Sequence, residues 1–199
     1  MATLRRVVNK PALVRTLLAL PAVPMAFALA AGRTSAGDLL HVTGELAAEL
    51  MIAVMIVTPL RMLFPKARWL VWTARHRRAF GVAAFGYAAL HTLFYVVDME
   101  TLRNILAEFW ALGIWTGWAA VAILGALALT SNDAALRWLR LRWKALHRWV
   151  YPAAVLTLVH WIFVDNDFGP ALAHFIPLAL LETYRIARTI ASNKAAQTG

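Results

Sequence analysis

The sequence predicts an all-α integral membrane protein, a six-helix transmembrane bundle with both termini in the cytoplasm. Of its 199 residues, 61% are hydrophobic and 15% are charged, whereas a soluble domain carries about 45–50% apolar and ~25% charged residues. Apolar stretches of about 20 residues recur along the chain, and each is long enough to cross ~30 Å of hydrocarbon as a helix. The charged residues lie at the ends of these stretches.

The predicted membrane segments share this length and composition and comprise residues 12–31, 44–64, 79–97, 111–130, 145–164 and 170–187. They divide the chain into a cytoplasmic N-terminus (1–11), one helical membrane domain (12–187) and a cytoplasmic tail (188–199). The first segment also resembles a signal peptide, because Arg5 and Arg6 precede it and small residues fill its end. We expect it to be retained, since Arg15 makes the apolar run begin late.

The Lys and Arg residues fix the predicted orientation. All of them except Arg33 and Arg103 fall on one side of the predicted membrane. The positive-inside rule places that side, with both termini, in the cytoplasm. This distribution accounts for the net charge of +10 without a nucleic-acid partner.

The absence of cysteine excludes several kinds of site. Disulfide scaffolds, thiolate zinc sites, cysteine-ligated iron–sulfur clusters and covalently attached haem all need cysteine. Any metal or cofactor must therefore be held by other side chains.

Two histidines lie deep in predicted helices at matching depth. His91 and His160 each stand about 20 Å from the inner end of an outward-running helix. Two imidazoles at one depth suit the axial ligation of a b-type haem iron. Gly81 and Gly86 precede His91 and would let a flat ring approach the backbone. The alternatives are a hydrogen bond between helices or a proton relay.

A second haem near the cytoplasmic side is a further prediction. His147 stands thirteen residues before His160, and its candidate partner is His76 or Arg77. Thirteen residues rotate a straight helix by ~140°, so Pro152 would have to correct the angle by a kink. The alternative is that His147 and His76 are interfacial residues near lipid phosphate.

The remaining charged candidates lie at the two sides of the membrane. On the inner side, we expect the cofactor's carboxylates to meet three basic residues, Arg77, Arg78 and Arg148. On the outer side, Glu45 and Glu49 stand near the start of a helix, whose dipole favours negative charge. His41 and His174 lie at the same interface, and a part in proton uptake is the alternative role for this group.

Several short motifs recur together along the chain, namely residues 43–47 (TGELA), 57–61 (VTPLR), 77–81 (RRAFG), 85–91 (FGYAALH), 127–131 (LALTS), 143–151 (WKALHRWVY) and His160. From about residue 40 to 185 these motifs resemble the MsrQ family, within the ferric-reductase-like transmembrane superfamily.

The resemblance implies haem b ligated by His91 and His160, with His147 available to a second haem or another cofactor, and FMN is associated with the family. It also implies a bacterial inner membrane location. Electrons would pass from quinol or a cytoplasmic reduced flavin to a periplasmic molybdopterin methionine sulfoxide reductase.

The chain has no nucleotide-binding glycine loop, so it would be an electron-transfer subunit and not a self-sufficient enzyme. The alternatives are a related cytochrome with another acceptor, a non-haem transporter of protons or metal ions, and a subunit that only anchors a partner.

Overall fold

A computed structural model describes residues 11–198, which form helices and no strands. The helices are joined by short connections and comprise α2 (Pro11–Ala19), α3 (Ala22–Ala30), α4 (Ala36–Leu63), α5 (Arg68–Asp98), α6 (Leu102–Glu108), α7 (Leu112–Leu129), α8 (Asp133–Leu139), α9 (Leu141–His147), α10 (Val150–Asp165) and α11 (Phe168–Thr198). The all-helical prediction is confirmed.

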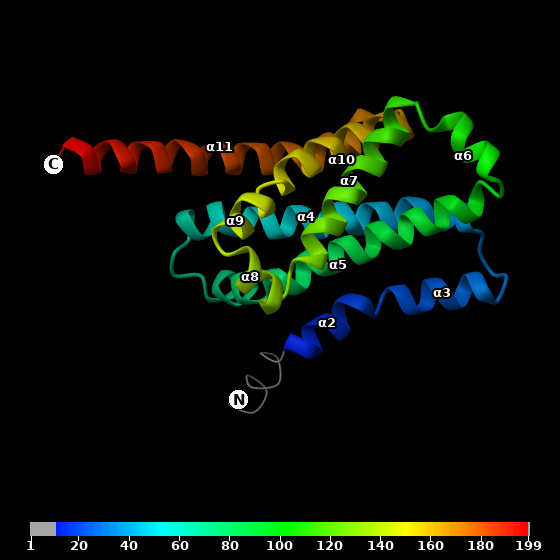
Figure 1. Cartoon of the computed structure of the whole chain (residues 1–199), viewed down its shortest axis with the longest axis horizontal. Coiled ribbons are helices and arrows are strands. Elements are labelled where there is room, and N and C mark those ends of the chain that lie inside the picture. The colour runs from blue at the N-terminus through cyan, green and yellow to red at the C-terminus, as the bar shows by residue number, and fades with distance from the viewer. Residues whose placement is uncertain (1–10, 199) are drawn as a thin grey trace.

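The long helices lie side by side, the short helices α6, α8 and α9 lie at the two ends, and α2 with α3 runs alongside the bundle (Figure 1). In this arrangement α4 packs on α5, α7 packs on α10, and α11 returns along α4. The connection from α3 to α4 and helix α6 lie at one end of the bundle, whereas α8 and α9 lie at the other (Figure 1). The core between α4 and α5 is rich in alanine, with Ala47, Ala48, Ala84 and Ala88 buried, and such small side chains let helices approach closely in a membrane.

Four segments of the described chain are long and apolar enough to cross a membrane, namely α2 with α3, α4, α5 and α7. The protein is therefore a multi-pass membrane protein. Helix α10 has 16 residues, about 24 Å of helix, which is short for a span. In α11 the apolar stretch is interrupted by polar residues. The count of six helices and the cytoplasmic position of the termini stay predictions.

The first predicted segment is two helices, because Pro21 lies at its centre. Helix α2 ends at Ala19 and α3 begins at Ala22. Proline has no N–H for the helical ladder and its ring clashes with the preceding turn. The backbone crosses the break through two tight turns, in which Leu20 donates to the Leu17 carbonyl and Val23 donates to the Leu20 carbonyl.

Helices α4 and α5 extend well beyond the predicted membrane segments. Helix α4 begins at Ala36 because Ser35 and Asp38 form a capping box, in which each side chain bonds the other residue's backbone N–H. Helix α5 begins at Arg68, so it carries His76, Arg77 and Arg78 on its first turns. Hydropathy marks where a helix is apolar, whereas capping residues decide where it begins.

The fifth predicted segment is broken near its start. Helix α9 ends at His147 and α10 begins at Val150, so His147 and His160 lie on different helices. Pro152 occupies the first turn of α10, where a missing N–H leaves no helical bond unmade. The predicted kink at Pro152 is replaced by a break at Arg148 and Trp149, which removes the angular constraint of a single straight helix.

Candidate functional site

His91 and His160 face each other inside the bundle. His91 projects from α5 and His160 from α10. Their ring centroids are 5.8 Å apart and the ring planes are nearly perpendicular, at 87°. The structure thus brings together the two residues that the sequence places at one depth.

Each of these rings is oriented by a carbonyl oxygen of a neighbouring helix. His91 Nδ1 lies 2.9 Å from the Leu40 carbonyl on α4, and His160 Nδ1 lies 2.7 Å from the Gly113 carbonyl on α7. A carbonyl oxygen only accepts, so each Nδ1 carries the proton and donates. The Nε2 of each neutral ring then keeps its lone pair. This is the tautomer that a metal-ligating histidine adopts.

Two glycines make room for the rings. A Cβ atom on Gly44 of α4 would lie 3.1 Å from His91 Nδ1, and a Cβ on Gly117 of α7 would lie 2.5 Å from His160 Nδ1. Both distances are shorter than ordinary contact between non-bonded heavy atoms. By contrast, a Cβ on Gly81 or on Gly86 would meet nothing within 4 Å. The glycines that admit the histidines therefore lie on the partner helices.

A buried threonine precedes each of these two glycines. Thr43 Oγ1 contacts the carbonyls of Leu39 and Leu40, at 2.7 and 3.1 Å. Thr116 Oγ1 makes the same contacts on α7, to the Leu112 carbonyl at 2.6 Å and the Gly113 carbonyl at 2.9 Å. A Thr-Gly pair with the same hydrogen bonds thus lies against each of the two histidines.

The two histidines line one apolar pocket. Its walls are mainly small and aliphatic residues of α4, α5 and α7. Tyr95 also lines it, and its hydroxyl is buried without a hydrogen-bond partner among residues 11–198. An adjoining pocket shares both histidines and reaches His41 and Asp165. The site is therefore an apolar chamber with two inward imidazoles, an unpaired hydroxyl and a wider outer compartment.

The arrangement fits a metal held between two imidazoles. With each nitrogen about 2.0 Å from a metal ion, the two ring centroids would lie about 6 Å apart, close to the observed 5.8 Å. The unpaired Tyr95 hydroxyl offers a hydrogen-bond donor to a polar edge of a bound group. An apolar site lined by two imidazoles at this separation suits a haem.

A third cavity lies between α4, α5, α7, α9, α10 and α11. Arg77, Arg78, Arg148 and His147 all line it. Arg77 donates to Thr58 Oγ1 at 2.8 Å, and Arg78 donates to Asp133 Oδ1 at 2.6 Å. The structure therefore brings together four of the predicted inner-site residues around a basic cavity, which we call the arginine cavity.

His147 is held against Trp143 at the edge of the arginine cavity. The two rings stack, with centroids 3.7 Å apart. His147 Nδ1 lies 3.1 Å from the Trp143 carbonyl, and its Nε2 lies 3.4 Å from Ser131 Oγ. Ser131 already donates to the Leu127 carbonyl, so the contact with Nε2 is weak and leaves that nitrogen open to a ligand.

His76 does not join His147. It lines a separate cavity with Arg15 and Arg75. Its Nδ1 donates to the Trp72 carbonyl at 2.9 Å, and its ring packs on the Trp72 ring. Among the described residues, His147 is the one histidine that lines the arginine cavity, and Arg77 is the predicted partner that shares it.

Sequence reasoning gave no role in the site to Thr43, Gly44, Thr116, Gly117 or Tyr95. One signal was available for the first four, since a Thr-Gly pair occurs in α4 and again in α7. Each pair lies in the helix that packs against a histidine-bearing helix. Tyr95 follows His91 by four residues on α5 and so lies on the same face.

Comparison with known proteins agrees with these features. The family model for the ferric reductase-like transmembrane component matches residues 43–158. Protein-methionine-sulfoxide reductase heme-binding subunit MsrQ of Rhizobium meliloti is 36% identical over 152 residues, which cover 74% of this chain and 68% of the relative. The protein of the same name from Cronobacter sakazakii is 34% identical, with 68% of each chain covered. That of Yersinia pseudotuberculosis is 33% identical, with 76% of each covered.

No solved structure matches the chain significantly. The matched family segment contains His91, His147 and both Thr-Gly pairs. The chain therefore belongs to the ferric-reductase-like transmembrane family and, within it, to the MsrQ proteins.

Proposed function

We propose that this protein is a membrane electron-transfer subunit that holds haem b between His91 and His160. The observation that carries the proposal is the pair of opposed rings whose Nδ1 atoms are both bonded to carbonyls, because both Nε2 atoms are then free to ligate. The relatives are named heme-binding subunits, which supports the same cofactor here. Haem, when bound, supplies a one-electron iron couple.

The chain's own residues would set the properties of that couple. The Leu40 and Gly113 carbonyls fix the orientation of the rings and increase the basicity of Nε2. The apolar walls exclude water and lower the local dielectric. Tyr95 would donate a hydrogen bond to a propionate or another polar group at the edge of the cofactor.

The arginine cavity is proposed as the inner cofactor site. Its guanidinium groups favour an anionic group, such as the phosphate of FMN or the propionates of a second haem. Among the described residues only one histidine, His147, lines it, so it offers no pair of histidine ligands. The geometry therefore favours FMN at this position over a second haem with two histidine ligands.

The two sites define a route across the bundle. Arg77 precedes His91 by fourteen residues on α5, about 21 Å along the helix axis. Electrons from quinol or a cytoplasmic reduced flavin would enter near the arginine cavity and leave from the outer compartment. The name of the relatives supports a methionine sulfoxide reductase as the acceptor, which we propose to be a periplasmic molybdopterin subunit at the bacterial inner membrane.

The visible spectrum of the purified full-length protein tests the haem proposal. The expected result is a b-type spectrum that is lost in His91→Ala and in His160→Ala. His41→Ala is the matched control, because the side chain of His41 is 58% exposed and lies outside the ligand pair. A colourless wild-type protein, or full haem content in both ligand variants, would contradict the proposal.

A further inference from the structure

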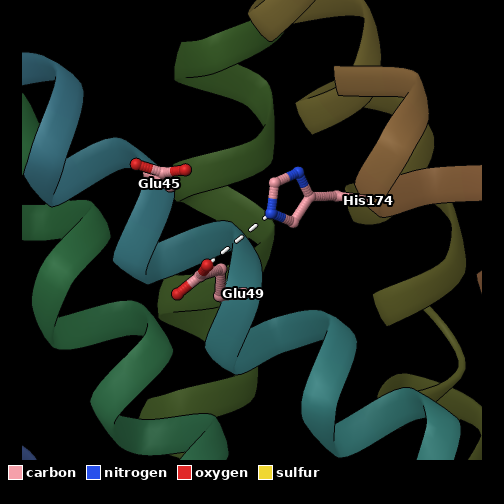
Figure 2. A group of neighbouring side chains, drawn as sticks. All are labelled: Glu45, Glu49 and His174. Atoms are coloured by element: carbon pink, nitrogen blue, oxygen red, sulfur yellow. Dashed lines mark ion pairs between the residues drawn. The ribbon is translucent and has the colours of Figure 1, made fainter. Parts of the chain in front are cut away.

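Three side chains that the electron-transfer route does not use meet between α4 and α11. Glu45 and Glu49 are one turn apart on α4, and His174 projects from α11 (Figure 2). One ligand atom from each lies within 4.8 Å of the others. Figure 2 shows the imidazole reaching across from α11 toward the two carboxylates.

The tautomer of His174 leaves a lone pair facing a carboxylate. Its Nδ1 lies 2.8 Å from the Pro170 carbonyl and therefore donates to it. Its Nε2 lies 3.6 Å from Glu49 Oε1. In the neutral ring this places two acceptors opposite each other, at a distance too long for a hydrogen bond. A cation between the two atoms would satisfy both of them.

The charge of this group also lacks compensation. Among the described residues, the ion-pair partners of Glu45 and Glu49 are histidines, His41 at 3.7 Å from Glu45 and His174 at 3.6 Å from Glu49. Glu49 lies only five residues, about 7.5 Å of helix, inside the predicted membrane segment that begins at residue 44. A carboxylate within an apolar segment is costly unless it is paired with a positive group.

The donor set indicates the kind of cation. One imidazole nitrogen and two carboxylate oxygens match zinc and similar divalent transition metals. Ligands on one tetrahedral ion at ~2.1 Å lie about 3.4 Å apart, so rotation about the flexible glutamate side chains has to close only a short gap. The ring of Trp161 stacks on His174, with centroids 5.3 Å apart, and holds it in place.

We propose that Glu45, Glu49 and His174 form a divalent transition-metal site that fastens α11 to α4. The site is distinct from the His91–His160 pair and does not depend on haem. A bound ion would neutralise both carboxylates and give α11 a fixed register on the bundle.

Zinc binding to the full-length protein in detergent tests the proposal. The protein is first stripped with a chelator and then titrated with Zn²⁺ by calorimetry. We expect one tight equivalent in the wild type and a rise of several degrees in the unfolding midpoint with zinc. His174→Ala and Glu49→Gln should each weaken this equivalent at least tenfold and abolish the thermal shift.

Glu100→Gln is the matched control, because Glu100 is an exposed carboxylate in the connection after α5 and should leave zinc binding unchanged. Glu49→Gln is nearly isosteric at an exposed position, so its circular dichroism should match the wild type. Absence of a stoichiometric site in the wild type would overturn the proposal. So would equal zinc binding in His174→Ala and Glu49→Gln, or equal losses in all three variants, which would indicate only adventitious surface ions.

Discussion

Replacing Gly117 with alanine tests the support of His160 directly. The added Cβ would lie 2.5 Å from His160 Nδ1, 2.8 Å from Cε1 and 3.2 Å from Cγ, whereas carbon atoms in contact prefer about 3.5–4.0 Å. The ring would have to move by about 1 Å. That movement would break the 2.7 Å bond from Nδ1 to the Gly113 carbonyl.

The cost can be estimated from these two effects. Overpacking costs about 1–3 kcal/mol, and the lost hydrogen bond adds about 1 kcal/mol. Together they predict that haem affinity falls by about 30-fold to 1,000-fold, since each 1.4 kcal/mol is a factor of ten. Alanine gains up to about 1 kcal/mol over glycine in helix propensity, so the helix itself should not be lost.

Haem titration into the apo-protein, followed by absorbance, measures this effect. Gly44→Ala should cause a smaller loss, because its Cβ would lie 3.1 Å from His91 Nδ1. Gly86→Ala is the control, since its Cβ would meet nothing within 4 Å, and it should bind haem as the wild type does. The reasoning fails if Gly117→Ala keeps wild-type affinity or if Gly86→Ala loses as much.

Three other predictions concern the arginine cavity, the α5–α8 contact and the chamber wall. His147→Ala should remove an inner flavin or haem while the haem of the outer pair remains, and cofactor extraction with redox titration would show one component lost; loss of both would contradict separate sites. Arg78 lowers the pKa of the Asp133 carboxyl by a hydrogen bond and by its charge. The contact therefore stabilises the folded protein fully at pH values above the ordinary aspartate pKa of about 3.9. This stabilisation is lost as the pH falls through the lower pKa of the folded state. Unfolding midpoints between pH 5 and pH 2 should therefore fall more steeply in the wild type than in Asp133→Asn, and parallel curves would refute the contact. Tyr95→Phe should stabilise the apo-protein, because it removes a buried hydroxyl without a partner, and should weaken haem binding; unchanged haem affinity would show that the hydroxyl does not contact the cofactor.

The sequence predicted the depth of the two ligand candidates because the rise of a helix is constant. Counting residues along two helices placed His91 and His160 at one level, and the rings are 5.8 Å apart. It did not predict the carbonyls that orient them, because Leu40 and Gly113 are distant in the chain from the histidines that they contact. Such a pairing depends on which helices become neighbours, and no local pattern specifies this.

The break between the helices of His147 and His160 is a second feature that the local sequence pattern did not predict. The prediction treated residues 145–164 as one helix, and the ~140° separation of His147 and His160 was the sign of a conflict. The structure ends α9 at His147 and starts α10 at Val150. Hydropathy averages over such a break, because the long apolar run that follows Val150 outweighs the few polar residues before it.

The repeated Thr-Gly pairs explain how two helices can each provide a carbonyl to a neighbour inside a membrane. A threonine that bonds a carbonyl of the preceding turn tends to bend its helix and to tilt that carbonyl outward. Glycine in the next position lets the imidazole approach the exposed oxygen without a steric clash. Each histidine is therefore positioned by an equivalent Thr-Gly pair: His91 by Thr43 and Gly44 on α4, and His160 by Thr116 and Gly117 on α7. Because both rings are held through Nδ1, their Nε2 atoms are left without a carbonyl partner and can accept a ligand.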